Sequence, residues 1–246
     1  MEIGVVVLVV AAVLLASTAH NITGFGFALT LMPFLLAALE VRDAVVVSTL
    51  LALATSLLLA RRIWTDVPWR SVLTLFAASV AGMPLGLLAL LFAPADALAL
   101  AIGAATVMMA ALLAAGARVP ARGRAGEVAA GLVSGVLRTS TSLDGPPVVL
   151  YLQGSGRTPE EFRATLTPFF MAGGALAVAT FAVSDVVTER ALLLALAGVP
   201  SVFAGHLLGH ALLGRVDAAA FHRIVLVLLV ATALASIGVA AARLAA

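Results

Sequence analysis

Residues 3–39 read IGVVVLVVAAVLLASTAHNITGFGFALTLMPFLLAAL, a run of 37 residues without an acid or an arginine. As one straight α-helix this run would be about 55 Å long, whereas the hydrocarbon core of a bilayer is about 30 Å thick. The helix must therefore break, and the polar, glycine-bearing stretch 20–26 is the predicted place. We expect at least one of Gly24 and Gly26 to adopt a positive φ or to approach another backbone closely, because glycine tolerates both.

The rest of the chain has the same apolar character. Of its 246 residues, 63% are hydrophobic and 11% are charged, whereas soluble domains carry about 45–50% and about 25%. Further apolar segments lie at 43–60, 71–92, 97–117, 128–137, 146–153, 164–182, 191–213 and 221–242. Because these segments lack the alternation typical of a barrel strand, we predict an all-α polytopic membrane protein.

A second interruption lies at 138–147, which reads RTSTSLDGPP. It separates two apolar pieces, 128–137 and 146–153, and neither piece alone is long enough to span a bilayer. Pro146 and Pro147 suit the first turn of a helix, where their missing N–H groups cost nothing. We interpret both interruptions as broken helices or re-entrant hairpins whose tips lie inside the membrane.

Weak matches between the two halves indicate an internal duplication, because the displacement between matched residues stays between 116 and 123. The matches are Thr49-Leu50 with Thr165-Leu166, Asp66-Val67 with Asp185-Val186, Gly82-x3-Gly86 with Gly205-x3-Gly209, and Asp96 with Asp217. We predict a first repeat at 1–117, a cytoplasmic Arg-rich linker at 118–127 and a second repeat at 128–246. Each repeat begins with a broken or re-entrant helix.

The distribution of arginine favours inverted repeats over parallel ones. If each broken segment returns to its starting side, ten loop arginines face the cytoplasm and three the outside, as the positive-inside rule requires. The inside set is Arg61, Arg62, Arg70, Arg118, Arg122, Arg124, Arg157, Arg163, Arg215 and Arg223, and the outside set is Arg42, Arg190 and Arg243. Inverted repeats with broken helices that meet at the midplane are typical of secondary transporters.

Arg138 and Asp144 are the charged residues that lie clearly within a membrane-embedded stretch, where an ionisable group marks a site by default. The guanidinium suits an oxyanion, and the half-helix that begins near Pro146 would point its positive end at the same place. Hydroxyls and a glycine complete this candidate substrate site, namely Thr139, Ser140, Thr141, Ser142 and Gly145. The alternative is a structural ion pair between Arg138 and Asp144, and the two interpretations can coexist.

The first break contributes a second set of candidate ligands, which pseudo-symmetry would place opposite Arg138. These are His20, Asn21, Thr23, Gly24 and Gly26. His20 could hydrogen-bond the substrate or take up a proton, whereas the alternative is a polar cluster that caps the broken backbone.

Other chemistry finds little support in the sequence. His206 and His210 share a helix face, but because Gly205 and Gly209 alternate with them, this pattern favours close helix packing over a metal site. The chain has no hydrolase motif and no cysteine, so we expect neither an enzyme nor a cofactor. A net charge of +2 implies no nucleic-acid partner.

The two breaks resemble those of the sulfite exporter TauE/SafE family, also called the toluene-sulfonate uptake permease family. The resemblance rests on Thr23-Gly24-Phe25-Gly26 through Pro33, and on the later stretches 131–135 (GLVSG) and 144–151 (DGPPVVLY). It implies a multi-pass transporter of the bacterial inner membrane that carries sulfite or an organosulfonate, with protons as a candidate coupling ion and a homodimer as a candidate assembly. The rival function is a passive channel or a divalent metal-cation permease that uses Asp144, His20 and His206.

The inverted arrangement predicts that both termini lie on the periplasmic side, because each half makes an odd number of net crossings. An alkaline phosphatase fused to the C-terminus should therefore be active, and a fluorescent protein fused there should be dark. The opposite pattern would exclude the inverted arrangement.

Overall fold

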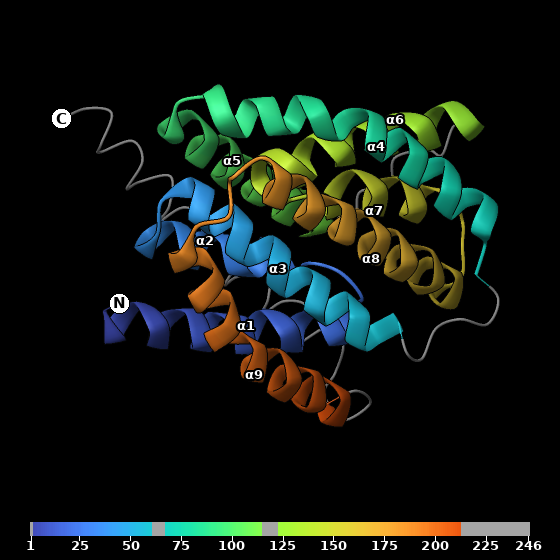
Figure 1. Cartoon of the computed structure of the whole chain (residues 1–246). Coiled ribbons are helices and arrows are strands. Elements are labelled where there is room, and N and C mark those ends of the chain that lie inside the picture. The colour runs from blue at the N-terminus through green and yellow to red at the C-terminus, as the bar shows by residue number, and fades with distance from the viewer. Residues whose placement is uncertain (1, 61–66, 115–122, 213–246) are drawn as a thin grey trace.

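The computed structural model describes residues 2–60, 67–114 and 123–212, and within these ranges it is entirely helical (Figure 1). The helices are α1 (Ile3–Thr23), α2 (Phe27–Ala38), α3 (Val41–Ala60), α4 (Trp69–Phe92), α5 (Ala95–Ala114), α6 (Gly123–Thr141), α7 (Gly145–Gly154), α8 (Pro159–Val183) and α9 (Glu189–Leu212). The predicted segment 221–242, and several loop arginines used to predict the topology, lie outside the described residues.

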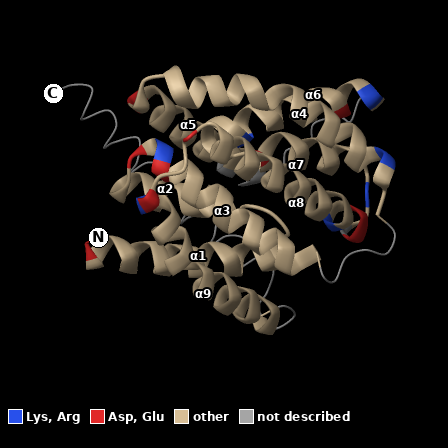
Figure 2. Cartoon of the chain, viewed as in Figure 1, with Lys and Arg blue, Asp and Glu red and all other residues tan. Residues whose placement is uncertain are grey.

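Five of these helices are long and apolar enough to cross a membrane, namely α1, α3, α4, α8 and α9. Figure 2 shows the charged residues gathered towards the ends of the helices, whereas the ribbons between these ends are almost free of charge. Such a distribution suits helices whose middles lie in hydrocarbon and whose ends reach water. The chain is therefore an all-α, multi-pass membrane protein, as the composition predicts.

The first interruption is three residues long and reverses the direction of the chain. α1 ends at Thr23, α2 begins at Phe27, and both glycines between them adopt positive φ, 82° at Gly24 and 87° at Gly26. The amide of Gly24 donates to the carbonyl of His20 and closes α1. Since α2 then packs back against α1, the expected role of the glycines in this turn is confirmed.

The second interruption is also three residues long, but it comes later than the apolar pattern indicates. α6 continues through the polar residues to Thr141, and α7 begins at Gly145. The helix accommodates Ser140 and Thr141 because their hydroxyls donate to the carbonyls four residues earlier, Val136 and Leu137. α6 is therefore a 19-residue helix, not the 10-residue piece that ends where the apolar run ends.

Glycines set two close helix crossings, α4 against α6 and α1 against α9. A Cβ on Gly82 or Gly86 of α4 would overlap backbone carbonyls of α6, and a Cβ on Gly135 of α6 would overlap the carbonyl of Ser79. In α9, a Cβ on Gly205 would lie 2.7 Å from the Leu14 carbonyl oxygen of α1. Small residues that let two backbones touch are the usual basis of helix association in membranes.

We expect Gly135→Ala to destabilise the protein by about 1–3 kcal/mol, because the added methyl group overpacks the α4–α6 crossing. Gly4→Ala is the matched control, since nothing lies within 4 Å of a Cβ at that position. Thermal unfolding in detergent, followed by tryptophan fluorescence, measures both variants. Equal unfolding temperatures for Gly135→Ala and Gly4→Ala would show that the crossing does not depend on backbone contact.

Candidate functional site

A cavity of about 50 Å³ lies where the two interruptions approach each other. Since one water needs about 10–15 Å³ of such space, the cavity holds a few waters or one small anion. Its lining comes from six helices and both breaks, with the residues His20, Gly26, Phe27, Ala28, Leu29, Thr49, Ala52, Leu53, Ser56, Arg138, Ser142, Leu143, Asp144, Gly145, Pro146, Phe170 and Gly174.

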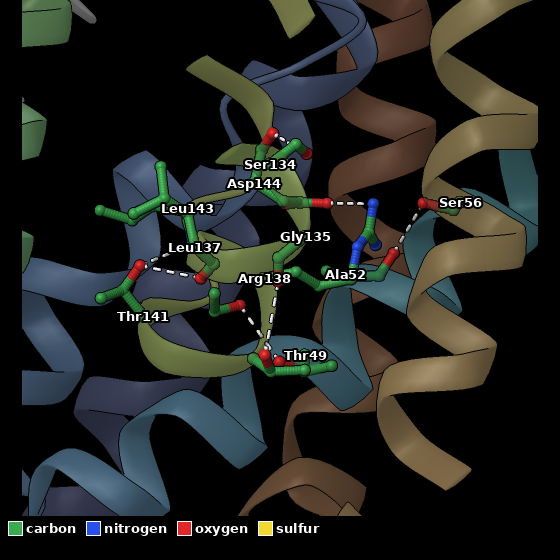
Figure 3. A network of polar contacts seen from close by, with 12 residues as sticks. Thr49, Ala52, Ser56, Ser134, Gly135, Leu137, Arg138, Thr141, Leu143 and Asp144 are labelled. Carbon is green, nitrogen blue, oxygen red and sulfur yellow. Dashed lines mark hydrogen bonds and ion pairs between the residues drawn. The ribbon is translucent and has the colours of Figure 1, made fainter. Parts of the chain in front are cut away.

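Arg138 and Asp144 form a buried ion pair in the wall of this cavity. Guanidinium Nη2 lies 2.6 Å from Asp144 Oδ2, and the two side chains are 5% and 16% exposed (Figure 3). Neither Nε nor Nη2 has a hydrogen-bond partner in the described part of the chain. A buried guanidinium with unused N–H donors can donate hydrogen bonds to a further anionic ligand.

Two residues of α8 hold the guanidinium in place. The ring of Phe169 lies beneath it, with 5.0 Å between the ring centroid and Arg138 Cζ, a distance typical of a cation–π contact. A Cβ on Gly173 would lie 2.6 Å from Nη2 and 2.7 Å from Nη1. The absence of a side chain at Gly173 therefore provides the space that the guanidinium occupies.

Hydroxyls form a second polar part of the wall, on α3 and at the α6–α7 break. Ser142 Oγ lies 3.0 Å from Ser48 Oγ and 3.2 Å from Thr49 Oγ1. Ser142 adopts a positive φ of 60°, which turns the chain out of α6. Ser56, further along α3, donates to the carbonyl of Ala52, so its oxygen retains the capacity to accept (Figure 3).

The first break supplies His20 and the N-terminus of α2 to the same cavity. The His20 ring meets the Phe27 ring edge-on at 6.3 Å, and no residue of the described part of the chain hydrogen-bonds its Nδ1. Phe27, Ala28 and Leu29 form the first turn of α2 and also line the cavity. The N–H groups of a first turn have no partner within the helix, so they are available to a ligand.

Of the twelve predicted site residues, six line the cavity: His20, Gly26, Arg138, Ser142, Asp144 and Gly145. The structure places the other six in helix packing or in the turns. Asn21 donates to the His206 carbonyl of α9, and Thr139 donates to the Met83 carbonyl of α4. Thr23, Ser140 and Thr141 bond carbonyls of their own helices, and Gly24 lies against the side chain of Arg163.

Sequence reasoning did not find the contributions of α3 and α8. Thr49 and Ser56 of α3 look like ordinary membrane-helix hydroxyls in the sequence, since no feature distinguishes them from Thr55. The pair Gly173-Gly174 was the available signal on α8, because two adjacent glycines inside an apolar helix indicate close approach of another group. The partner of that approach is Arg138.

The predicted packing role of the α9 histidines agrees with their position. Gly205 and Gly209, which alternate with His206 and His210, meet α1 at Ser17 and Asn21. Within the described residues, no group of three or more His, Cys, Asp or Glu side chains could hold a metal ion.

The model of the family described as "Sulfite exporter TauE/SafE" matches residues 9–236, nearly the whole chain. The chain belongs to this family. No curated protein and no solved structure matches it significantly. The TauE/SafE protein is therefore a multi-pass membrane transporter, and membership implies sulfur-containing anions as the class of substrate. The resemblance predicted from the two breaks is confirmed.

Gly173→Ala should reduce anion transport by about tenfold or more, because the methyl group displaces the guanidinium, and each charged hydrogen bond that it would donate to a bound anion is worth about 1.5–3 kcal/mol. Gly4→Ala is the control, since nothing lies within 4 Å of a Cβ at that position and Gly4 does not line the cavity. Flux into proteoliposomes, normalised to folded protein, measures both variants. If Gly173→Ala transported as well as Gly4→Ala, the position of Arg138 would not matter for transport.

Proposed function

We propose that this TauE/SafE protein is a secondary transporter of a small sulfur-containing oxyanion, such as sulfite or an organosulfonate. The anion binds near the midplane of the bacterial inner membrane, between the two broken helices. The observation that carries this proposal is one small cavity that receives Arg138 together with the first turns of both α2 and α7.

Arg138 and the first turns of α2 and α7 all favour a negative charge in the cavity. Arg138 offers a planar fork that matches the oxygens of a sulfite or sulfonate group. Gly145 and Pro146 begin α7, as Phe27 and Ala28 begin α2, so the positive ends of both helix dipoles face the cavity. Short helices that point their N-termini at an anionic substrate are a recurrent plan of secondary transporters.

The close contacts of the two halves support the predicted duplication. Gly205 and Gly209 of α9 meet the carbonyls of Leu14 and Thr18 on α1, just as Gly82 and Gly86 of α4 meet those of Leu132 and Val136 on α6. Asn21 donates to the carbonyl of His206 as Thr139 donates to that of Met83. The displacement is 118 residues between α1 and α6 (132 − 14, 136 − 18, 139 − 21) and 123 residues between α4 and α9 (205 − 82, 206 − 83, 209 − 86).

The course of the helices supports inversion of the second half. Figure 1 shows α1 and α6 running in opposite directions, and likewise α3 and α8. Both breaks have three residues and begin with a positive φ, at Gly24 and at Ser142. Inverted halves that meet at one site provide the two related conformations that alternating access needs.

A passive channel or a divalent cation permease finds less support in this cavity. Its acidic group, Asp144, is already paired with Arg138. A cation that entered would meet the guanidinium and two positive helix ends, each of which repels it.

Variants of the ion pair test the proposal. Arg138→Lys keeps the charge but loses the planar fork, so transport should fall while the protein remains folded. Arg138→Ala leaves Asp144 buried and unpaired, which costs about 3–5 kcal/mol, so folding should suffer as well as transport. Uptake of radiolabelled sulfite or isethionate into proteoliposomes measures the function. Separate uptake of Ni²⁺ and Co²⁺ tests the rival cation permease.

The double variant Arg138→Ala with Asp144→Ala separates a ligand from a structural pair. It leaves no lone buried charge, so expression should recover under either interpretation. Transport should stay low if Arg138 binds the anion. The proposed function would be refuted if the double variant carried the anion as fast as the wild type. It would also be refuted if the wild type carried the metal cations and no anion.

A further inference from the structure

Asp144 occupies the position at Arg138 that a substrate anion would take. Its carboxylate lies 2.6 Å from guanidinium Nη2, and both residues line the cavity. A carboxylate and a sulfite or sulfonate group both present negatively charged oxygens to the same fork. Without substrate, the protein therefore neutralises its buried arginine with an internal anion.

The charges that face the cavity do not balance once a substrate is added. Arg138 and Asp144 contribute one positive and one negative charge, and the segments of α2, α3, α7 and α8 that line the cavity contribute none. Counted over the ionised groups, a bound monoanion would leave one net negative charge in a buried site, where the N-termini of α2 and α7 offer only partial charges. Burial of an uncompensated charge is costly, and a buried acid normally avoids the cost by taking up a proton.

We propose that Asp144 is an internal counter-ion that the substrate displaces from Arg138 and that binds one proton as it is displaced. This inference rests on the proposed function. The proton comes from the aqueous side on which the anion enters and adds to the free carboxylate, forming an O–H bond. When the anion leaves on the other side, the carboxyl group releases the proton there and pairs again with Arg138.

The geometry favours exchange at Asp144. Its contact with Nη2 is an ion pair, and no hydrogen bond to Nη2 adds to it among the described residues. Asp144 lies at the break itself, where it is the N-cap residue of α7. Its side chain is also less deeply buried than that of Arg138, with 16% against 5% exposed.

His20 is the other titratable group that faces the cavity, from α1. Its imidazole is a base, as the guanidinium is, so the two cannot form an ion pair, and arrival of a substrate at Arg138 removes no partner from His20. The substrate changes the electrostatic partner of Asp144 alone. We therefore assign the proton to Asp144.

Charge balance also determines whether the empty protein moves a net charge when it returns to bind a second anion. The empty cavity holds Arg138 paired with ionised Asp144, and the loaded cavity holds Arg138, the monoanion and protonated Asp144. Both states are neutral, so neither pays to move a net charge through a medium of low dielectric constant. Transport of a monoanion should therefore be insensitive to the membrane potential.

Isethionate is the probe for this test, because its sulfonate remains a monoanion throughout the usable pH range. Wild-type protein in proteoliposomes that contain a trapped pH dye should carry about one proton with each isethionate, and a potassium diffusion potential should not change the rate. Asp144→Asn keeps the size of the side chain but cannot ionise. It should still exchange isethionate for isethionate at a rate that does not depend on the potential, because its loaded cavity is neutral. Its net uptake should move almost no protons and should depend on the potential, because the empty cavity then carries the unpaired charge of Arg138.

His20→Asn and Asp144→Glu are the matched controls. Both should keep about one proton per isethionate whatever their absolute flux, because the ratio and not the rate reports the proton site. Sulfite itself binds a proton near neutral pH. With sulfite, the number of protons moved per anion should therefore be about one higher in wild type than in Asp144→Asn.

Proton coupling that survives in Asp144→Asn, or that disappears in His20→Asn, would overturn the assignment. Should Asp144→Asn fail to fold, wild type decides the matter: isethionate or sulfite flux that moves no protons, or that depends on the potential as a free anion does, refutes the inference while the proposed function stands. Absence of flux for both anions in wild type refutes the proposed function and the inference together.

Discussion

The burial of one guanidinium determines the arrangement of the centre of this protein. A charge in a medium of low dielectric constant needs a partner of opposite sign and close polar or aromatic neighbours. Asp144 supplies the charge, Phe169 the aromatic face and Gly173 the space. These three residues come from the α6–α7 break and from α8, so the position of Arg138 depends on the packing of α8 against the rest of the bundle.

Backbone contacts between helices hold each of the two breaks on a closely packed pair of helices. α6 touches α4, and α1 touches α9, at glycines where no side chain intervenes. Such contacts allow little sliding, because any shift along the helix brings a larger residue to the crossing. The broken ends of α1 and α6 are therefore carried by two stiff pairs of helices, which suits rigid-body movement of one pair relative to the other.

The sequence predicts the breaks well and their side chains less well. A break is forced by length, because 37 apolar residues exceed the thickness of a bilayer. Which hydroxyl reaches a ligand depends on helical phase and on the neighbouring helix. Thr139 faces α4, whereas Ser142, three residues later and outside the helix, faces α3 and the cavity. The place of Gly173 against Arg138 depends on tertiary contact, which no local pattern encodes.

The proposed duplication gives the two halves similar turns but different chemistry at equivalent positions. Arg138 corresponds to His20 at the same displacement of 118 residues, and each lies four residues before a turn that begins with positive φ. One break thus contributes a permanent charge and the other an imidazole ring, while each is followed by a helix N-terminus. A single guanidinium can neutralise only one negative charge, so a dianion would retain an unbalanced charge in the cavity even with Asp144 protonated. Within this proposal, selectivity for monoanions follows from the asymmetry between the halves and not from the size of the cavity alone.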